Sequence, residues 1–307
     1  MKCVLGIDGG GTKTECVVLN EAGAVLARGR GAASNPTRIG FPAALAALQE
    51  TIDSTVKSIC ISFEVAAVCA GLAGTGRPEN HDQMQRFLQE QFPNGLVDVR
   101  TDLELVLSAM PQGPAIVLVA GTGSAAIGRD ASGLVKRQGG FGPASSDEGS
   151  AFDIGRNAIA ASRGEDSAAA SELSRQILRH LGCSNWADVD LKSAAAPDTV
   201  YPRVFPVVAA AADSGNSLAQ SLLQAAAETL GALSYSLAES LSISQQEFPL
   251  GKTGGTVVRS RFFDQAIDQA LLRRLPNAIV NLLSVEPAEV AAWIALQLYK
   301  SRAGRTP

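Results

Sequence analysis

A strand followed by a glycine-rich turn occurs near the N-terminus and again about 110 residues later, and this pattern limits the fold more than any other feature. The apolar run 3–8 leads directly into Gly9-Gly10-Gly11-Thr12. Apolar residues then predict strands at 15–19 and 24–28, which are joined by a turn that contains Gly23. The start of the chain therefore predicts a three-stranded meander with a glycine turn at its first corner.

The second copy of this pattern follows the break at Pro111-Gln112-Gly113-Pro114. A buried strand is predicted at 115–120, a glycine turn at Gly121-Thr122-Gly123, and a further strand at 124–128 before the turn that ends at Gly133. In both copies the threonine of the glycine turn lies 11 residues before the glycine of the next turn. This equal spacing favours a duplicated domain.

The remainder of the chain alternates between predicted strands and helices, which indicates the α/β class. The helices are predicted at 41–57, 81–91, 103–109, 217–241, 261–272 and 286–299, and further strands at 65–69 and 97–101. Another helix is expected to begin near Ala151, and another glycine turn is predicted at 251–255. A length of 307 residues favours two domains over one.

Composition and charge exclude several functional classes. The net charge of −4 and the isoelectric point near 5.4 argue against a nucleic-acid-binding surface, which needs clustered Lys and Arg. No apolar stretch approaches the roughly 18 residues of a membrane helix, and Asp8 interrupts the short apolar start, so neither a membrane span nor a secretory signal is predicted. We expect a cytoplasmic protein.

The five cysteines are scattered and form no CxxC pair, and the chain has only two histidines. Such a set is typical of reduced thiols in a protein core, and it predicts neither disulfides nor a zinc site.

The glycine turns are candidate anion sites. Glycines after a strand let backbone N–H groups approach a phosphate closely, and the hydroxyls of Thr12 and Thr14 together with Lys13 add further donors. Asp8, at the end of the first strand, is suited to holding Mg²⁺ through water. A tight turn that uses glycine only for its geometry is the alternative interpretation.

Two common nucleotide signatures do not fit. The P-loop spacing GxxxxGK[ST] is absent around Lys13-Thr14. Gly121 to Ala126 matches GxGxxA, but a dinucleotide fingerprint must open a helix, and here the turn 128–133 follows instead. The second glycine turn therefore favours a hairpin.

Four motifs, in the same order along the chain, resemble those of the BadF/BadG/BcrA/BcrD ATPase family, which includes N-acetylglucosamine kinases and belongs to the actin-like ATPase and sugar-kinase superfamily. The first two phosphate motifs are matched by residues 5–14 and 120–124. Gly139-Gly140-Phe141-Gly142 with 146–150 resembles the segment that follows them, and 253–257 resembles the adenosine motif.

The resemblance implies an α/β fold of two ribonuclease-H-like domains facing across a cleft, consistent with the repeat. We expect an N-terminal domain at 1–112 and a C-terminal domain with helical additions at 113–287, with a last helix near 288–302 that packs back on the N-terminal domain. The resemblance also implies an ATP- and Mg²⁺-dependent kinase that phosphorylates the 6-hydroxyl of N-acetylglucosamine or glucosamine. A homodimer is a further expectation from relatives.

The resemblance also assigns site residues. Asp102 matches the catalytic base, and Asp8 would hold Mg²⁺ through water. The nucleotide-binding positions are Gly10, Gly11, Thr12, Lys13, Thr122, Gly123, Gly254 and Gly255, and the sugar-binding positions are Asn35, Ser124, Gly140, Phe141 and Asp147. Glu148 has no assigned role beyond support of its neighbours.

Two of these carboxylates have a structural alternative. Thr101-Asp102-Leu103-Glu104 matches a capping box, so Asp102 could simply occupy the first turn of a helix, where the macrodipole favours a carboxylate. Asp147 precedes the helix predicted near Ala151 and could accept backbone N–H bonds there.

Two other functions compete with the kinase. The family also contains dimeric ATPases that activate a partner enzyme and hold an iron–sulfur cluster between subunits through cysteines, but no cysteine here lies in a glycine-rich cluster motif. A non-catalytic, nucleotide-sensing scaffold is the third interpretation, and an intact Asp102 argues against it.

Overall fold

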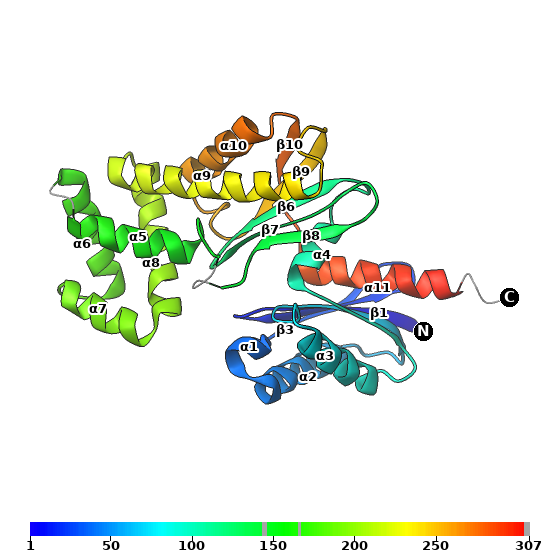
Figure 1. Ribbon diagram of the computed structural model, residues 1–307. Helices are drawn as coiled ribbons and strands as arrows, with labels where there is room; N and C mark the ends of the chain where they lie inside the picture. Colours follow the sequence, from blue (N-terminus) through cyan, green and yellow to red (C-terminus); the bar gives the residue numbers. More distant parts are fainter. Residues whose placement is uncertain (143–145, 165–166, 304–307) are drawn as a thin grey trace. The chain divides into compact units, whose positions relative to one another are not determined.

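The computed structural model describes residues 1–142, 146–164 and 167–303, and the chain forms two compact units (Figure 1). Unit 1 consists of Met1–Ala109 and the C-terminal segment from Val285, and unit 2 consists of Met110–Ser284. The boundaries between the two units therefore fall a few residues before the predicted domain ends at 112 and 287.

Unit 1 contains one five-stranded sheet in the order β3-β2-β1-β4-β5. Its strands are β1 (Lys2–Gly9), β2 (Thr14–Asn20), β3 (Val25–Gly31), β4 (Glu64–Leu72) and β5 (Leu96–Arg100). Its helices are α1 (Pro36–Ile39), α2 (Phe41–Lys57), α3 (Pro78–Gln91), α4 (Asp102–Ser108) and α11 (Pro287–Ala303). The first three strands form an antiparallel meander, whereas β4 and β5 run parallel to β1.

Alternating side chains of β1 bury apolar surface on both faces of this sheet. Leu5 and Ile7 pack with residues of α2 and α3, and Val4 packs with α11 on the opposite face. Figure 1 shows α2 and α3 on one side of the sheet and α11 on the other. Both ends of the chain therefore contribute to one core.

Unit 2 repeats this topology with a sheet in the order β10-β9-β6-β7-β8. Its strands are β6 (Ala115–Ala120), β7 (Ser124–Arg129), β8 (Val135–Gly139), β9 (Phe248–Thr253) and β10 (Ala278–Leu282). Again a three-stranded antiparallel meander is followed by two strands parallel to its first strand. The predicted α/β class with a duplicated unit is confirmed.

The two units differ mainly in their helices. Unit 2 contains α5 (Ala151–Gly164), α6 (Ala168–Leu181), α7 (Trp186–Ala195), α8 (Pro197–Asp213), α9 (Ser217–Ser240) and α10 (Arg261–Arg274). Together with one face of the sheet, these helices bury a single large apolar core. Helices α5 to α9 lie between β8 and β9 in the sequence, where unit 1 has only α1 and α2.

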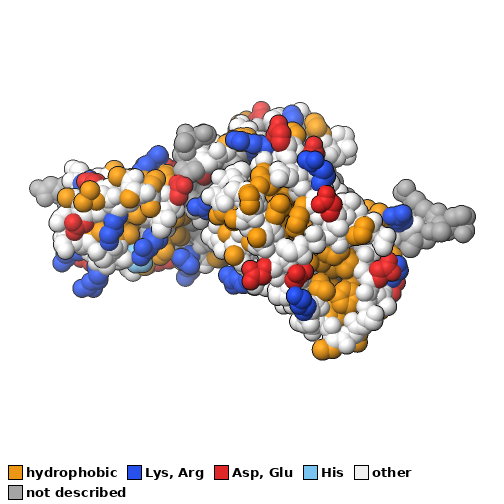
Figure 2. Space-filling model, turned by 90° about the horizontal axis from the view of Figure 1, so that it is seen from below, with side chains coloured by type: hydrophobic (Ala, Val, Ile, Leu, Met, Phe, Trp, Pro, Cys, Tyr) orange, Lys and Arg blue, Asp and Glu red, His pale blue; other side chains and the backbone are white. Residues whose placement is uncertain are grey.

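The surface shown in Figure 2 carries Lys and Arg side chains interspersed with Asp and Glu. Among the residues that the structure describes, no helix is long and apolar enough to cross a membrane. Burial raises the pKa values of Cys3, Cys16 and Cys69 to about 12, so these three cysteines remain protonated thiols.

Candidate active site

The first glycine turn joins β1 to β2, and a buried network holds it in place. The Gly10 amide donates to the Lys13 carbonyl at 2.9 Å, so this N–H closes the turn and does not point outward as a free donor. Thr12 is exposed at the tip. Thr14 is fully buried, and its hydroxyl donates to the Ala32 carbonyl at 2.6 Å and is hydrogen-bonded to the Ser34 hydroxyl at 2.8 Å.

Lys13 forms an ion pair with Glu15 on the same hairpin, with 2.5 Å between Nζ and Oε2. We predicted Lys13 as a phosphate ligand. In this structure, much of its charge is already neutralised by a neighbour, so a phosphate would have to compete with Glu15.

Asp8 and Asp102 lie near each other at the carboxyl ends of the parallel strands. Asp8 in β1 is paired with Gly71 in β4, and Gly71 is paired with Arg100 in β5, two residues before Asp102. Burial is the main cause that raises the pKa of Asp8 to about 6, with smaller contributions from the negative charges of Asp102 and Glu15. This edge of the sheet therefore carries a concentrated negative charge, which a cation would stabilise.

Asp102 is the first residue of α4, but other residues perform the capping. The Thr101 hydroxyl accepts from the Glu104 amide at 3.2 Å, and the Glu104 carboxylate accepts from the Thr101 amide at 2.7 Å, which completes the predicted capping box. Oδ1 of Asp102 accepts from the next amide, that of Leu103, at 3.0 Å. The capping box and a chemical role for Asp102 are therefore compatible.

Asn35 caps the short helix α1, where its Oδ1 accepts from the amide and the hydroxyl of Thr37. A Cβ atom added to Gly74, whose φ is +88°, would lie 2.6 Å from this oxygen. The glycine after β4 thus allows the loop to approach Asn35 closely. Because Oδ1 already accepts two hydrogen bonds, the predicted sugar contact of Asn35 would have to use its amide nitrogen.

In unit 2 the glycine turn 121–123 is joined to the start of α5. The Ala151 amide donates to the Gly121 carbonyl at 2.9 Å, and the Phe152 amide donates to the Thr122 carbonyl at 3.3 Å. Thr122 is exposed at the tip of the turn between the first two strands, as Thr12 is in unit 1.

The third glycine turn contacts the second. Gly254 has a φ of +111°, and a Cβ atom there would lie 2.1 Å from the Ala120 carbonyl oxygen, so only glycine fits. The Thr256 hydroxyl donates to the same oxygen at 2.7 Å. The turn is shorter than we predicted, because Gly251, Lys252 and Thr253 belong to β9 and only 254 and 255 of the predicted residues lie outside it.

Asp147 lies against the second glycine turn and is 9% exposed. A Cβ atom on Gly123 would lie 2.7 Å from its Oδ2. Burial raises the pKa of Asp147, and the amides of Ser124 and Gly142, which donate to the carboxylate, oppose this rise. Its Oδ1 has no hydrogen-bond partner among the described residues. A buried acceptor of this kind is unfavourable unless a water or a ligand donates to it.

The other predicted sugar contacts of unit 2 differ in accessibility. Ser124 is 2% exposed, and its hydroxyl donates to the Glu148 carbonyl at 2.7 Å, so in this structure it links β7 to the 147–148 segment. Phe141 is 62% exposed, and the guanidinium of Arg137 lies 4.3 Å from the centre of its ring. Gly140, with a φ of +75°, and Glu148 are exposed.

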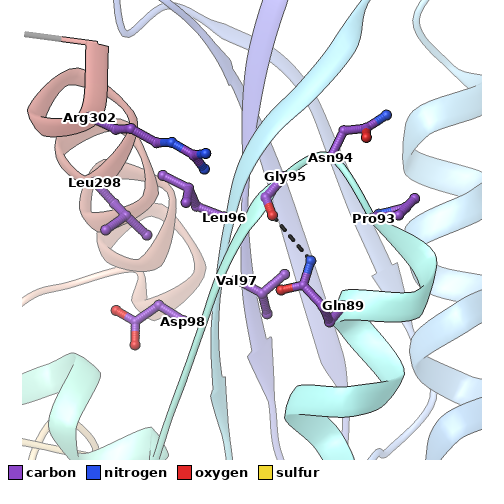
Figure 3. Close-up of a pocket in the computed structure, with 9 residues that line it drawn as sticks. All are labelled: Gln89, Pro93, Asn94, Gly95, Leu96, Val97, Asp98, Leu298 and Arg302. Carbon is purple, nitrogen blue, oxygen red and sulfur yellow. Dashed lines mark hydrogen bonds between the residues drawn. The ribbon is translucent and has the colours of Figure 1, made fainter. Parts of the chain in front are cut away.

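A groove of about 730 Å³ in unit 1 lies elsewhere (Figure 3). It is lined by Gln89 of α3, the segment 93–98 and two residues of α11, Leu298 and Arg302. None of the predicted site residues lines this groove. The groove lies at the beginning of β5, whereas Asp102 comes after the end of this strand.

Three residues at these turns were not predicted from the sequence. Arg38 lies over Gly11, Gly74 contacts Asn35, and Asp153 accepts from the Gly149 amide at 2.9 Å at the start of α5. For Gly74 a signal was present, because Ala73-Gly74-Thr75-Gly76 follows a predicted strand as the other glycine turns do. Among the residues described, there is no group of three or more His, Cys, Asp or Glu side chains that could hold a metal ion.

Two known proteins match this chain along nearly its whole length. The chain is 27% identical over 316 residues to N-acetyl-D-glucosamine kinase of Dictyostelium discoideum, an alignment that covers 96% of this chain and 98% of that protein. It is 29% identical over 305 residues to N-acetylmuramic acid/N-acetylglucosamine kinase of Clostridium acetobutylicum, covering 96% and 98%.

A solved structure has the same fold. The crystal structure of a candidate N-acetylglucosamine kinase from Chromobacterium violaceum superposes with a TM-score of 0.75 at 23% identity, covering 97% of this chain and 99% of that one. The sequence profile of the BadF/BadG/BcrA/BcrD ATPase family matches residues 5–295. With nearly its whole length matched, the chain belongs to the BadF/BadG/BcrA/BcrD ATPase family.

Proposed function

We propose that this protein transfers the γ-phosphoryl group of ATP to the 6-hydroxyl of an amino sugar, N-acetylglucosamine or glucosamine. The observation that carries the proposal is the position of Asp102 near Asp8, at the strand ends beside the first glycine turn. Two full-length relatives that are named as kinases of N-acetylated amino sugars support it.

In the proposed reaction, Asp102 accepts the proton of the sugar hydroxyl as its oxygen attacks the γ-phosphorus. The new bond joins the sugar oxygen to phosphorus, the bond from phosphorus to the bridging oxygen of ATP breaks, and ADP leaves with that oxygen. The capping box of Thr101 and Glu104 supports the start of α4 and so holds Asp102 in position. Positioning and charge stabilisation supply most of the catalysis in such transfers.

Asp8 is the residue suited to hold Mg²⁺ through water. It is a partly buried carboxylate whose pKa burial raises to about 6, next to the charges of Asp102 and Glu15, and a divalent cation would offset this repulsion. When bound, Mg²⁺ would neutralise charge that develops on the phosphate oxygens. A single carboxylate is consistent with an ion that keeps most of its waters and binds the nucleotide phosphates.

Unit 2 supplies the remaining groups in this proposal. Thr122 and Gly123 bind phosphate, and Gly254 and Gly255 bind the adenosine part of ATP. Asp147 accepts hydrogen bonds from sugar hydroxyls, because its buried Oδ1 has no protein donor among the described residues. Phe141 has one ring face beneath Arg137 and offers the other for stacking on the sugar.

The test is a coupled assay of ADP release with N-acetylglucosamine, glucosamine, glucose and N-acetylmuramic acid, combined with the position of the phosphate in each product. We expect turnover that depends on sugar and is highest with an N-acetylated amino sugar or glucosamine, with phosphate on O6. ATP turnover that is independent of every sugar, together with iron in the purified protein, would instead favour an activating ATPase. Nucleotide binding without turnover would favour a non-catalytic scaffold.

A further inference from the structure

An arginine side chain covers the first glycine turn. Arg38 belongs to the last turn of α1 and is exposed to solvent. A Cβ atom added to Gly11 would lie 2.9 Å from Nη1 and 3.2 Å from Cδ of Arg38. The backbone of Gly11 therefore lies directly against the arginine side chain.

The segment that carries Arg38 is fixed to the same turn. The Ser34 amide donates to the Gly10 carbonyl at 3.1 Å, and the Ser34 and Thr14 hydroxyls are hydrogen-bonded to each other at 2.8 Å. Both hydroxyls are fully buried. Arg38 follows four residues later in a helix capped by Asn35, so its backbone has little freedom relative to the glycine turn.

The charges around this turn leave Arg38 as an available cation. Lys13 is paired with Glu15, and Asp8 and Asp102 add negative charge at the neighbouring strand ends. No carboxylate among the described residues forms an ion pair with Arg38. A polyphosphate that approaches the turn would therefore meet the guanidinium of Arg38, whose planar donors suit phosphate oxygens.

We propose that the guanidinium of Arg38 binds the γ-phosphate of ATP over the first glycine turn. The inference rests on the proposed function, in which Asp102 deprotonates the hydroxyl that attacks the γ-phosphorus. Since Asp102 and Asp8 lie beside the first glycine turn, the γ-phosphate is the phosphate that must come closest to it. Arg38 would thus distinguish ATP from ADP and stabilise the phosphoryl group during transfer.

Titration calorimetry with Mg²⁺ and either β,γ-imido-ATP or ADP tests this assignment. Arg38→Gln should weaken binding of β,γ-imido-ATP at least about tenfold and that of ADP by less than about threefold, because ADP lacks the γ-phosphate. Arg38→Lys keeps the charge but loses the planar fork, so it should fall between Arg38→Gln and the parent. Arg86→Gln is the matched control, since Arg86 is exposed on α3 and its Nε donates only to the Asp82 carbonyl of the same helix among its described contacts.

Equal losses for both nucleotides, or unchanged affinity for β,γ-imido-ATP, would overturn the assignment. So would a selective loss of turnover with N-acetylmuramic acid relative to N-acetylglucosamine at unchanged nucleotide affinity, because Arg38 would then bind the carboxylate of the acceptor. If the parent protein phosphorylates no sugar, the proposed function fails, whereas the two nucleotide titrations still decide the role of Arg38.

Discussion

Asp102 is both the proposed catalytic base and the first residue of α4, and one substitution can separate these two roles. Asp102→Asn keeps the shape of the side chain and the first turn of α4 but removes the proton acceptor. We expect single-turnover phosphorylation to slow by about 10²- to 10⁴-fold, with sugar affinity changed by less than about threefold, because the lost interaction matters mainly in the transition state. The melting temperature should change little, because Thr101 and Glu104 form the cap.

Thr101→Ala is the matched comparison. It removes the capping hydroxyl and should lower the free energy of unfolding by about 1 kcal/mol. Its single-turnover rate should fall far less than that of Asp102→Asn. If Asp102→Asn retains turnover within about threefold of the parent, Asp102 is not the base.

Asp8 should make stability depend on pH in the direction opposite to that of most carboxylates. Its pKa in the folded protein is raised from 3.8 to about 6, so the folded state holds the proton more tightly than the unfolded state. Stability is therefore fully present below about pH 4 and is lost as the pH rises through 6. A shift of one pKa unit corresponds to about 1.4 kcal/mol. The shift of Asp8 from 3.8 to about 6 therefore lowers the free energy of unfolding by at most about 3 kcal/mol at high pH.

Asp8→Asn removes this titration and should be more stable than the parent at pH 8, in buffer without Mg²⁺ or nucleotide. The difference in the free energy of unfolding should decrease through pH 6 and disappear near pH 4. Urea unfolding at pH 4, 6 and 8 measures it. A difference that is constant with pH, or a variant less stable than the parent at pH 8, would contradict the raised pKa.

At the scale of elements, β1 and α11 pack so closely that position 6 must be glycine, because the methyl group of an alanine would not fit there. A Cβ atom on Gly6 would lie 2.0 Å from the Ala292 nitrogen and 2.2 Å from the Ala288 oxygen, which are both backbone atoms. Gly6→Ala should therefore displace α11 and lower the free energy of unfolding by about 1–3 kcal/mol or more. Denaturant unfolding provides the measurement.

Gly164→Ala is the corresponding control, because a Cβ atom at this last position of α5 meets no atom of the described residues within 4 Å. It should be neutral or stabilising by up to about 1 kcal/mol. If Gly6→Ala were equally neutral, α11 would not be seated on β1 as described.

Elements with a strong periodic pattern could be predicted from the sequence, and those stabilised by distant partners could not. Helix α2 and strand β6 occupy the predicted residues because their apolar spacing is regular. In β9, glycine and lysine suggested a turn, but Lys252 is buried in the strand because Asp264 and Asp268 of α10 pair with it at 2.6 and 2.5 Å. Strand β10 was missed because four of its five residues are not buried.

The same limit applies to the candidate site. The glycine turns and Asp102 were identified by motifs that lie within a few adjacent residues. Arg38 was not, because its approach to Gly11 depends on the hydrogen bond between Ser34 and Gly10, which are 24 residues apart in the sequence. Roles that arise from packing between separate segments therefore require the structure.

At the scale of the whole molecule, the two units repeat one topology but complete their hydrophobic cores in different ways. Unit 2 is continuous from Met110 to Ser284, and its core lies entirely within that segment. Unit 1 requires the C-terminal segment, because α11 residues such as Ala291, Ala292 and Leu296 bury one face of its sheet. Unit 1 can therefore complete its core only after α11 has been made.

A chain that ends at Ser284 should separate the stabilities of the two units. Without α11, the apolar face that Val4, Leu19 and Ala67 present would be exposed to water, at a cost of roughly 25 cal/mol for each Å² of apolar surface. We expect amide hydrogen exchange to show lost protection in β1 and β4 and retained protection in β6 and β9. A peptide covering residues 285–303, added in trans, should restore protection in unit 1. The same peptide with Ala292→Glu should not, because Ala292 is fully buried and contacts Gly6. Full protection of β1 in the truncated chain would show that unit 1 folds without α11, and loss of protection in both units would show that unit 2 is not independent.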